Sequence, residues 1–108
     1  MGMEAPPPYA IAGKELLLDT PEARATIMTL SPGQRIPPHR HTHVTDHTFC
    51  LAGTAVVTLH DPEETLPLGP GDASRVPPGR VHEVANAGET PARLLLLQGP
   101  GAYDFLPA

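Results

Sequence analysis

Residues 33–53 read GQRIPPHRHTHVTDHTFCLAG, and residues 71–86 read GDASRVPPGRVHEVAN. In the first stretch His39, His41 and His43 alternate with other residues, and alternate residues of a β-strand point to the same face. The two prolines before His39 favour extended backbone there. An H-x-H pair in such backbone presents two imidazoles to one metal ion, although a solvated histidine-rich loop would read the same locally.

Short apolar segments separated by turn residues extend over the rest of the chain. The 108 residues include 15 prolines and 10 glycines, most of which stand between apolar segments. The expected strands are residues 9–11, 16–19, 23–30, 46–52, 54–60, 65–68, 73–76, 81–86 and 92–98. Residues 54–60 follow 46–52 through a tight glycine turn, and 65–68 with 73–76 read as a hairpin. Strands at roughly 8–12-residue spacing predict a sandwich or barrel, and residues 101–106 are compatible with a helical turn.

The spacing within the first stretch is a more specific signal than the alternation. Gly33, His39, His41, Asp46 and Gly53 stand at intervals that resemble the first motif of the cupin family, in which the acid is usually Glu. The two histidines and both glycines match this motif. Aspartate in place of glutamate is the departure.

The second stretch resembles the second cupin motif through Gly71, Pro77, Gly79, His82 and Asn86. Together the two stretches make the chain similar to small single-domain bacterial cupins of the conserved-barrel type. The resemblance implies an all-β fold, the cupin double-stranded β-helix or jelly-roll barrel. We expect a flexible arm at residues 1–8 and one barrel domain over residues 9–108.

The resemblance also implies one divalent transition metal ion (Fe, Mn, Ni, Co, Cu or Zn) per chain, held by His39, His41 and His82, with Asp46 in the fourth position. Nitrogen and oxygen donors suit all of these metals. Because aspartate is one methylene shorter than glutamate, three roles stay open for Asp46: direct ligation, ligation through a water molecule, or hydrogen bonding only.

Several other polar residues have open roles. His43 and His41 would point to the same face of a strand, so strand alternation alone permits a His41/His43 pair of ligands. The spacing to the motif glycines favours His39 with His41. His43 and His47 are the candidates for an acid–base catalyst, although His47 should face away from the metal in a regular strand. Cys50 is expected in the core. Asn86 either caps a strand end or supports the site.

The charge pattern and chain ends restrict the partners. The seven basic residues do not cluster and the formal net charge is −5, which argues against nucleic-acid binding. No apolar run reaches the roughly 18–20 residues of a membrane span. The start of the chain lacks the basic and apolar regions of a signal peptide, so we expect a cytoplasmic protein. An isolated barrel of this size buries a modest core, which predicts a homodimer.

The sequence supports two functional hypotheses. The first is a metalloenzyme of dioxygenase, isomerase or lyase type that acts on a small organic molecule. The second is a non-catalytic cupin module that binds or senses a metal or small ligand. A closed pocket beside the metal would favour the first, and a shallow, solvent-filled site the second.

Overall fold

The computed structural model describes residues 9–108, and ten β-strands form its framework. The strands are β1 (Gly13–Asp19), β2 (Arg24–Leu30), β3 (Arg35–Arg40), β4 (Thr45–Ala52), β5 (Ala55–Leu59), β6 (Glu64–Leu68), β7 (Ala73–Val76), β8 (His82–Ala85), β9 (Ala92–Gly99) and β10 (Leu106–Pro107). No helix occurs within these described residues. The predicted all-β architecture is confirmed, and the predicted flexible arm at 1–8 lies outside the described residues.

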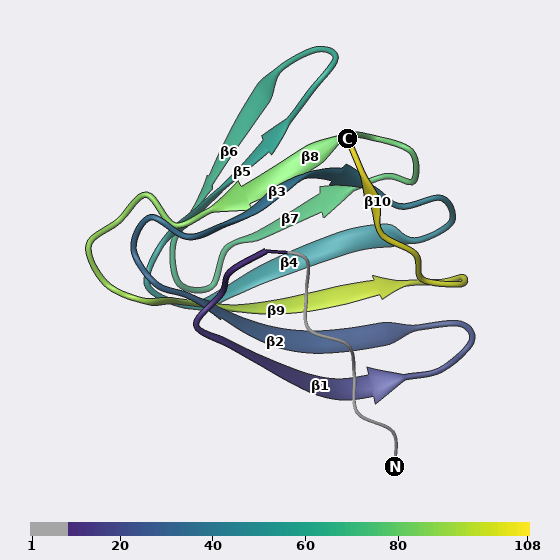
Figure 1. Cartoon of the computed structure of the whole chain (residues 1–108), viewed down its shortest axis with the longest axis horizontal. Coiled ribbons are helices and arrows are strands. Elements are labelled where there is room, and N and C mark those ends of the chain that lie inside the picture. Colours follow the sequence, from purple (N-terminus) through teal and green to yellow (C-terminus); the bar gives the residue numbers. More distant parts are fainter. Residues whose placement is uncertain (1–8) are drawn as a thin grey trace.

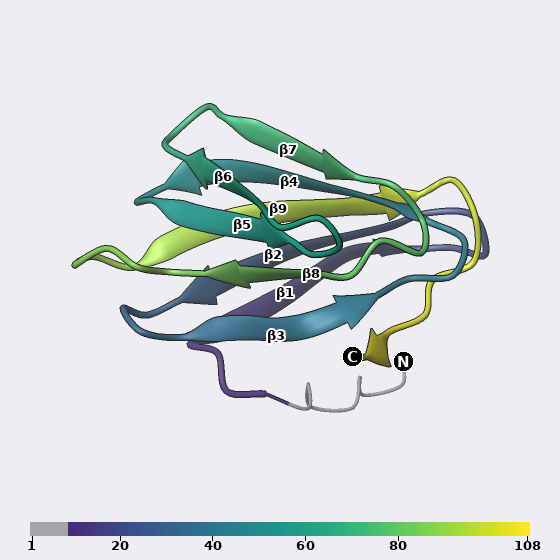
Figure 2. The same cartoon turned by 90° about the horizontal axis from the view of Figure 1, so that it is seen from above.

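The strands form two five-stranded antiparallel sheets that face each other (Figure 1, Figure 2). The first sheet has the order β1-β2-β9-β4-β7, and the second has the order β10-β3-β8-β5-β6. Neighbouring strands in each sheet are mostly distant in sequence, so the chain crosses repeatedly between sheets. This two-layer arrangement is the predicted jelly-roll barrel.

Regular alternation of side chains builds the core between the sheets. In β2 every second residue is buried, and β5 and β9 follow the same period-two pattern. Aliphatic side chains from both inner faces pack together and exclude water from the space between the sheets. The buried cluster contains Met28, Leu30, Ile36, Cys50, Ala55, Val57, Leu59, Leu68, Val76, Val84, Ala92, Leu94 and Leu96.

Two strand pairs that are adjacent in sequence do not pair in space. β4 pairs with β7 and β9, whereas β5 pairs with β6 and β8. The glycine turn between β4 and β5 is therefore a corner between sheets. The predicted hairpin of residues 65–68 and 73–76 is wrong for the same reason, because β6 and β7 lie in different sheets.

Both ends of the described chain differ from the expected local structure. Residues 9–11 form no strand, and residues 101–106 form no helical turn. The tail instead extends across the barrel and ends in β10, which pairs with β3. Glycine and proline at the start of the tail disfavour a helix, and contacts with β3 decide its path.

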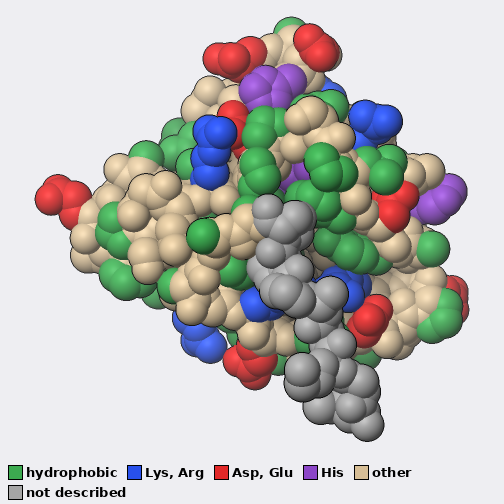
Figure 3. Space-filling model, viewed as in Figure 1, with side chains coloured by type: hydrophobic (Ala, Val, Ile, Leu, Met, Phe, Trp, Pro, Cys, Tyr) green, Lys and Arg blue, Asp and Glu red, His purple; other side chains and the backbone are tan. Residues whose placement is uncertain are grey.

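Charged side chains are spread over the face of the molecule that Figure 3 shows. There the Lys and Arg side chains stand apart from one another instead of forming one patch. Within residues 9–108, no helix is long and apolar enough to cross a membrane.

Candidate metal centre

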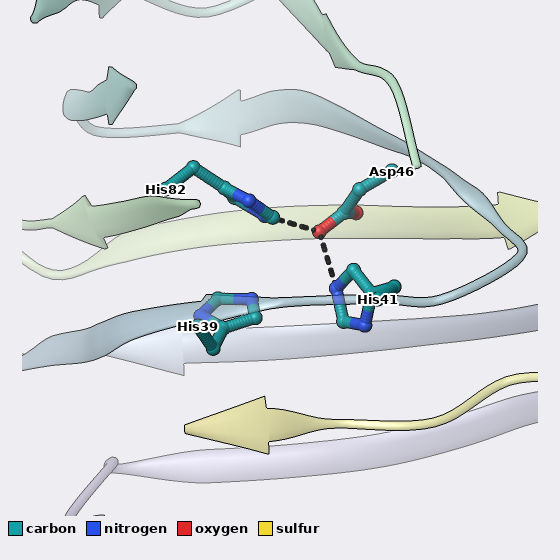
Figure 4. Close-up of side chains that lie close together, drawn as sticks. All are labelled: His39, His41, Asp46 and His82. Carbon is teal, nitrogen blue, oxygen red and sulfur yellow. Dashed lines mark hydrogen bonds and ion pairs between the residues drawn. The ribbon is translucent and has the colours of Figure 1, made fainter. Parts of the chain in front are cut away.

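Four predicted site residues come together from both sheets. His39 lies near the end of β3, His41 follows that strand, and His82 begins β8 opposite His39. Asp46 is the second residue of β4 in the first sheet. The cluster therefore bridges the two layers at one end of the barrel (Figure 4).

Backbone hydrogen bonds connect the two histidine stretches. The amide of Gly79, which has a φ of 81°, donates to the carbonyl of His41 at 2.8 Å. A positive φ is accessible to glycine at little cost, which explains the glycine in this turn. The turn thus holds the backbone at His41 close to the strand that carries His82.

The donor atoms of the four side chains converge. Nε2 of His41 lies 3.1 Å from Oδ2 of Asp46, and Nε2 of His82 lies 2.9 Å from the same oxygen. The His39 and His82 ring centroids are 4.3 Å apart. One donor atom from each of the four residues lies within 4.8 Å of all the others, and all four residues are buried.

A backbone carbonyl orients each imidazole through Nδ1. Nδ1 of His39 lies 2.7 Å from the carbonyl of Pro37, and Nδ1 of His82 lies 2.9 Å from that of Arg80. Nδ1 of His41 lies 2.5 Å from the carbonyl of Asp104. Because a carbonyl accepts, each Nδ1 carries the donated proton, and in a neutral ring this leaves Nε2 as a lone pair. Metal-binding histidines show this arrangement.

The contacts around Asp46 fit a bound cation. Two imidazole lone pairs and a carboxylate oxygen repel one another unless a cation, a proton or a metal ion, lies between them. The second carboxylate oxygen, Oδ1, is buried and has no hydrogen-bond partner among the described residues. A buried carboxylate oxygen without a partner is costly, and ligation would satisfy it. The four residues form a group that could hold a metal ion.

The electrostatics of the cluster are those of a cation site. Burial and the neighbouring His82 lower the pKa of His39 to about 4. Burial opposes ionisation of Asp46, but hydrogen bonds from His41 and His82 hold its pKa well below the usual range. Burial also opposes protonation of His41, but its hydrogen bond with Asp46 prevails and raises the pKa of His41. Around neutral pH the cluster thus holds an ionised carboxylate, which attracts a cation.

The low pKa of His39 predicts an acid-sensitive fold for the metal-free chain. The pKa is about 4 in the folded state against 6.5 as the reference value, so stability is fully present above pH 6.5 and is lost as the pH falls toward 4. We expect the free energy of unfolding to drop by about 2–3 kcal/mol across this window. Stabilisation from His41, whose pKa is raised, is complete below pH 6.5 and adds no loss here.

Urea unfolding of chelator-treated protein at pH 7 and at pH 4.5 measures this difference. His39→Gln serves as the comparison, because it cannot take up the proton. An equal drop in stability for His39→Gln and the original chain would show that another group is responsible.

The C-terminal tail covers the histidines, and this contact was not predicted from the sequence. Besides the carbonyl that accepts from His41, Asp104 uses its carboxylate to accept from the amide of Thr42 at 2.7 Å and from its hydroxyl. The Phe105 ring stacks on His39, with centroids 4.6 Å apart and planes 18° apart. The tail therefore orients one ligand and shields another from water.

One signal in the sequence pointed to this tail. The chain has only two Tyr and two Phe, and Tyr103 and Phe105 are half of them. Aromatic side chains in a short glycine- and proline-containing tail need a surface to cover. The sequence alone could not say that this surface would be the histidine cluster.

The other polar residues singled out in the sequence lie outside this cluster. His43 is exposed in the loop after His41, and His47 is on the outer face of β4, stacked with Phe49. Cys50 is a buried free thiol in the core, as predicted. Asn86 accepts from the amide of Gly88 and donates to two carbonyls, so it caps the strand end.

Comparison with known proteins shows which family and which curated proteins the sequence of this chain is similar to. A family model described as "Cupin domain" matches residues 26–97. Germin-like protein subfamily T member 3 of Arabidopsis thaliana is 35% identical over 84 residues, which are 75% of this chain and 35% of that protein. Mannose-1-phosphate guanylyltransferase RfbM of Salmonella typhimurium is 33% identical over 76 residues, which are 70% of this chain and 15% of that enzyme.

Structural comparison shows the same architecture. A protein with a double-stranded beta-helix domain from Klebsiella pneumoniae superposes with a TM-score of 0.81 at 26% identity, covering 96% of this chain and 84% of that one. By contrast, the chain spans only 15% to 35% of the length of the two curated relatives. The similarity to those relatives concerns one barrel and not their whole activities.

Proposed function

Since this chain belongs to the cupin family, we propose that His39, His41, Asp46 and His82 bind one divalent transition metal ion (Fe, Mn, Ni, Co, Cu or Zn) and that the barrel is a small metalloenzyme. Its substrate would be a small organic molecule, and its reaction of dioxygenase, isomerase or lyase type. The observation that carries the proposal is the convergence of Nε2 of His41 and Nε2 of His82 on one oxygen of Asp46.

The chain's own groups support such chemistry by preorganisation. A bound metal ion would supply Lewis-acid chemistry or, as Fe(II), oxygen chemistry. The carbonyls on Nδ1 hold each imidazole in one orientation, so the donor set needs little rearrangement. Burial of all four side chains lowers the local dielectric and strengthens every electrostatic contact in the site.

Proton transfer has no assigned residue. Within the cluster every imidazole would be a ligand, so a general base must come from elsewhere. His43 and His47 remain the candidates for the general base. Because His43 is exposed and His47 points outward, the substrate or a water molecule would have to connect either one with the metal cluster.

Metal analysis of the purified protein tests the proposal. Protein from cells grown without added metal is expected to carry about one transition metal ion per chain by mass spectrometry. The metal is then removed, each of the six candidate metals is restored in turn, and oxygen consumption and substrate conversion are followed. Absence of stoichiometric metal in every preparation would overturn the metal site. Full loading without turnover would favour the non-catalytic binding or sensing module.

We also propose that two copies associate through the outer face of the first sheet. Leu51 and Leu97 are 44% and 38% exposed on this face, and Leu95 lies opposite Phe49 and Ile27 in neighbouring strands. An apolar stripe across three strands matches a second copy of itself around a two-fold axis.

Light scattering at micromolar concentration is expected to give twice the 11.4 kDa chain mass. Leu97→Glu should shift the mass to that of one chain. Val56→Glu, on the outer face of β5 in the other sheet, should leave the dimer intact. A monomeric mass for the unaltered chain would contradict the dimer.

A further inference from the structure

All four residues of the metal centre are sealed from solvent. His39 and His41 are 3% and 2% exposed, and Asp46 and His82 are 2% and 1% exposed. A metal ion or a substrate therefore reaches the donor atoms only if a part of the chain moves aside. The segment that moves is the one that leaves its position at the lowest cost in free energy.

The C-terminal tail, residues 100–108, is held more weakly than the strands that carry the ligands. Figure 2 shows the tail passing from β9 in the first sheet to β3 in the second. It ends in β10, which is two residues long, lies at the edge of its sheet and within residues 9–108 pairs with one neighbour. By contrast, β3, β4 and β8 each pair with strands on both sides. Local opening of the barrel therefore begins at the tail.

Two aromatic rings of the tail cover two of the ligands. The Phe105 ring stacks on His39, and the centroid of the Tyr103 ring lies 5.4 Å from that of the His41 imidazole. Tyr9, from the other end of the described chain, contacts Phe105 with ring centroids 5.8 Å apart. When the tail leaves β3, both rings leave with it, and the faces of His39 and His41 become accessible.

A pair of hydrogen bonds fastens the middle of the tail to the loop after His41. The carboxylate of Asp104 accepts one from the amide of Thr42 at 2.7 Å and one from the Thr42 hydroxyl. Hydrogen bonds to a charged group are stronger than those between neutral groups. Thr42 is exposed, however, so water replaces its donors and acceptors when the contact breaks, and the net cost of release is modest. The contact is therefore strong enough to hold the tail and weak enough to open.

We propose that the C-terminal tail is the gate of the metal centre and that Thr42 and Asp104 form its latch. The metal ion and the substrate enter and leave while the latch is open, and the closed state carries out the reaction. This inference rests on the proposed metal site and adds its route of access. The carbonyl that orients His41 belongs to Asp104, so closure of the tail completes the donor set and excludes water in one step.

Thr42→Val tests the latch, with Thr42→Ser as its matched control. Valine has nearly the shape of threonine but lacks the hydroxyl that donates to Asp104, whereas serine keeps one. Because the latch is closed with and without the metal ion, its loss favours opening equally in both states. We expect uptake and release of Co(II) both to become at least about threefold faster in Thr42→Val, with an unchanged Kd. Stopped-flow mixing of metal-free protein with Co(II), and of loaded protein with excess chelator, measures the two rates.

A disulfide between β10 and β3 tests the gate without removing a contact of the metal centre. Leu106 and Arg40 are register partners in these strands, and the Cα atoms of such partners lie at a distance that a disulfide spans. Leu106→Cys is combined with Arg40→Cys, and Cys50 stays apart because it is buried in the core. The oxidised chain is expected to take up and release Co(II) at least about 10-fold more slowly than the same chain after reduction, because opening then requires the barrel itself to open.

Equal rates in the oxidised and reduced double variant would overturn the gate, and so would equal rates in Thr42→Val and Thr42→Ser. A weaker Kd in Thr42→Val with an unchanged rate of uptake would also overturn it, because the pair would then only orient His41. If the double variant does not fold, the two Thr42 variants decide. The Co(II) content of the unaltered chain is measured separately. Absence of stoichiometric Co(II) there removes the metal site and the gate together, whereas full content with unaltered rates in the variants removes the gate alone.

Discussion

Replacement of His39 by alanine is expected to weaken metal binding by more than about 100-fold. Loss of a group that only orients a ligand costs 10–100-fold, and loss of a ligand itself should exceed that. His39 is the most informative ligand to replace, because no hydrogen bond joins its Nε2 to Asp46. Its removal leaves both contacts between histidine and aspartate in place, so the effect on metal affinity can be separated from an effect on folding.

The matched control is His43→Ala. His43 has the same alternation in the sequence but is exposed in the loop, so its loss should change metal affinity less than about twofold. Competition with a chromophoric chelator measures both variants under one condition. If His43→Ala loses the metal and His39→Ala retains it, the ligand pair is His41 with His43.

Substitution of Gly53 by alanine is expected to destabilise the fold by about 4 kcal/mol or more. The φ of Gly53 is +71°, a left-handed conformation that costs other residues about 1–2 kcal/mol. In addition, a Cβ at this position would lie 2.3 Å from the carbonyl oxygen of Pro91. Backbone cannot move aside as a flexible side chain can, so the corner between β4 and β5 must open.

Gly71→Ala provides the comparison for this prediction. Gly71 has a φ of +91°, but apart from its two chain neighbours no atom of residues 9–108 lies within 4 Å of the position its Cβ would take. Only the conformational cost of about 1–2 kcal/mol remains. Urea unfolding of metal-free protein measures both variants. Equal losses would mean that the contact with Pro91 relaxes at no cost.

Much of the candidate site could be predicted from local sequence. Alternation predicted that His39, His41 and His43 point to one face of a strand, and the resemblance to the two cupin motifs implied His39, His41, Asp46 and His82 as the set. These inferences work because a strand repeats every two residues and a corner with positive φ needs glycine. Asp46 is the instructive member: its contact with two histidines is clear in the structure, whereas its sequence position showed only a departure from glutamate.

The pairing of strands could not be predicted in the same way. The segments on either side of Gly53 look like a hairpin locally, yet they separate into different sheets. Local sequence encodes that a chain turns, but the partner of a strand depends on which inner face buries its apolar side chains. That choice is made by contacts between distant segments.

The histidine stretch thus determined by itself that an extended segment would present imidazoles to one side, and the resemblance to the two cupin motifs implied that the second stretch would meet it. Only the tertiary structure decided what surrounds them. The carbonyl that orients His41 comes from Asp104, 63 residues away, and Asp46 contacts His41 and His82 only because the two sheets face each other. Such contacts leave no local periodicity in the sequence, because they form when two faces of a closed barrel are brought together.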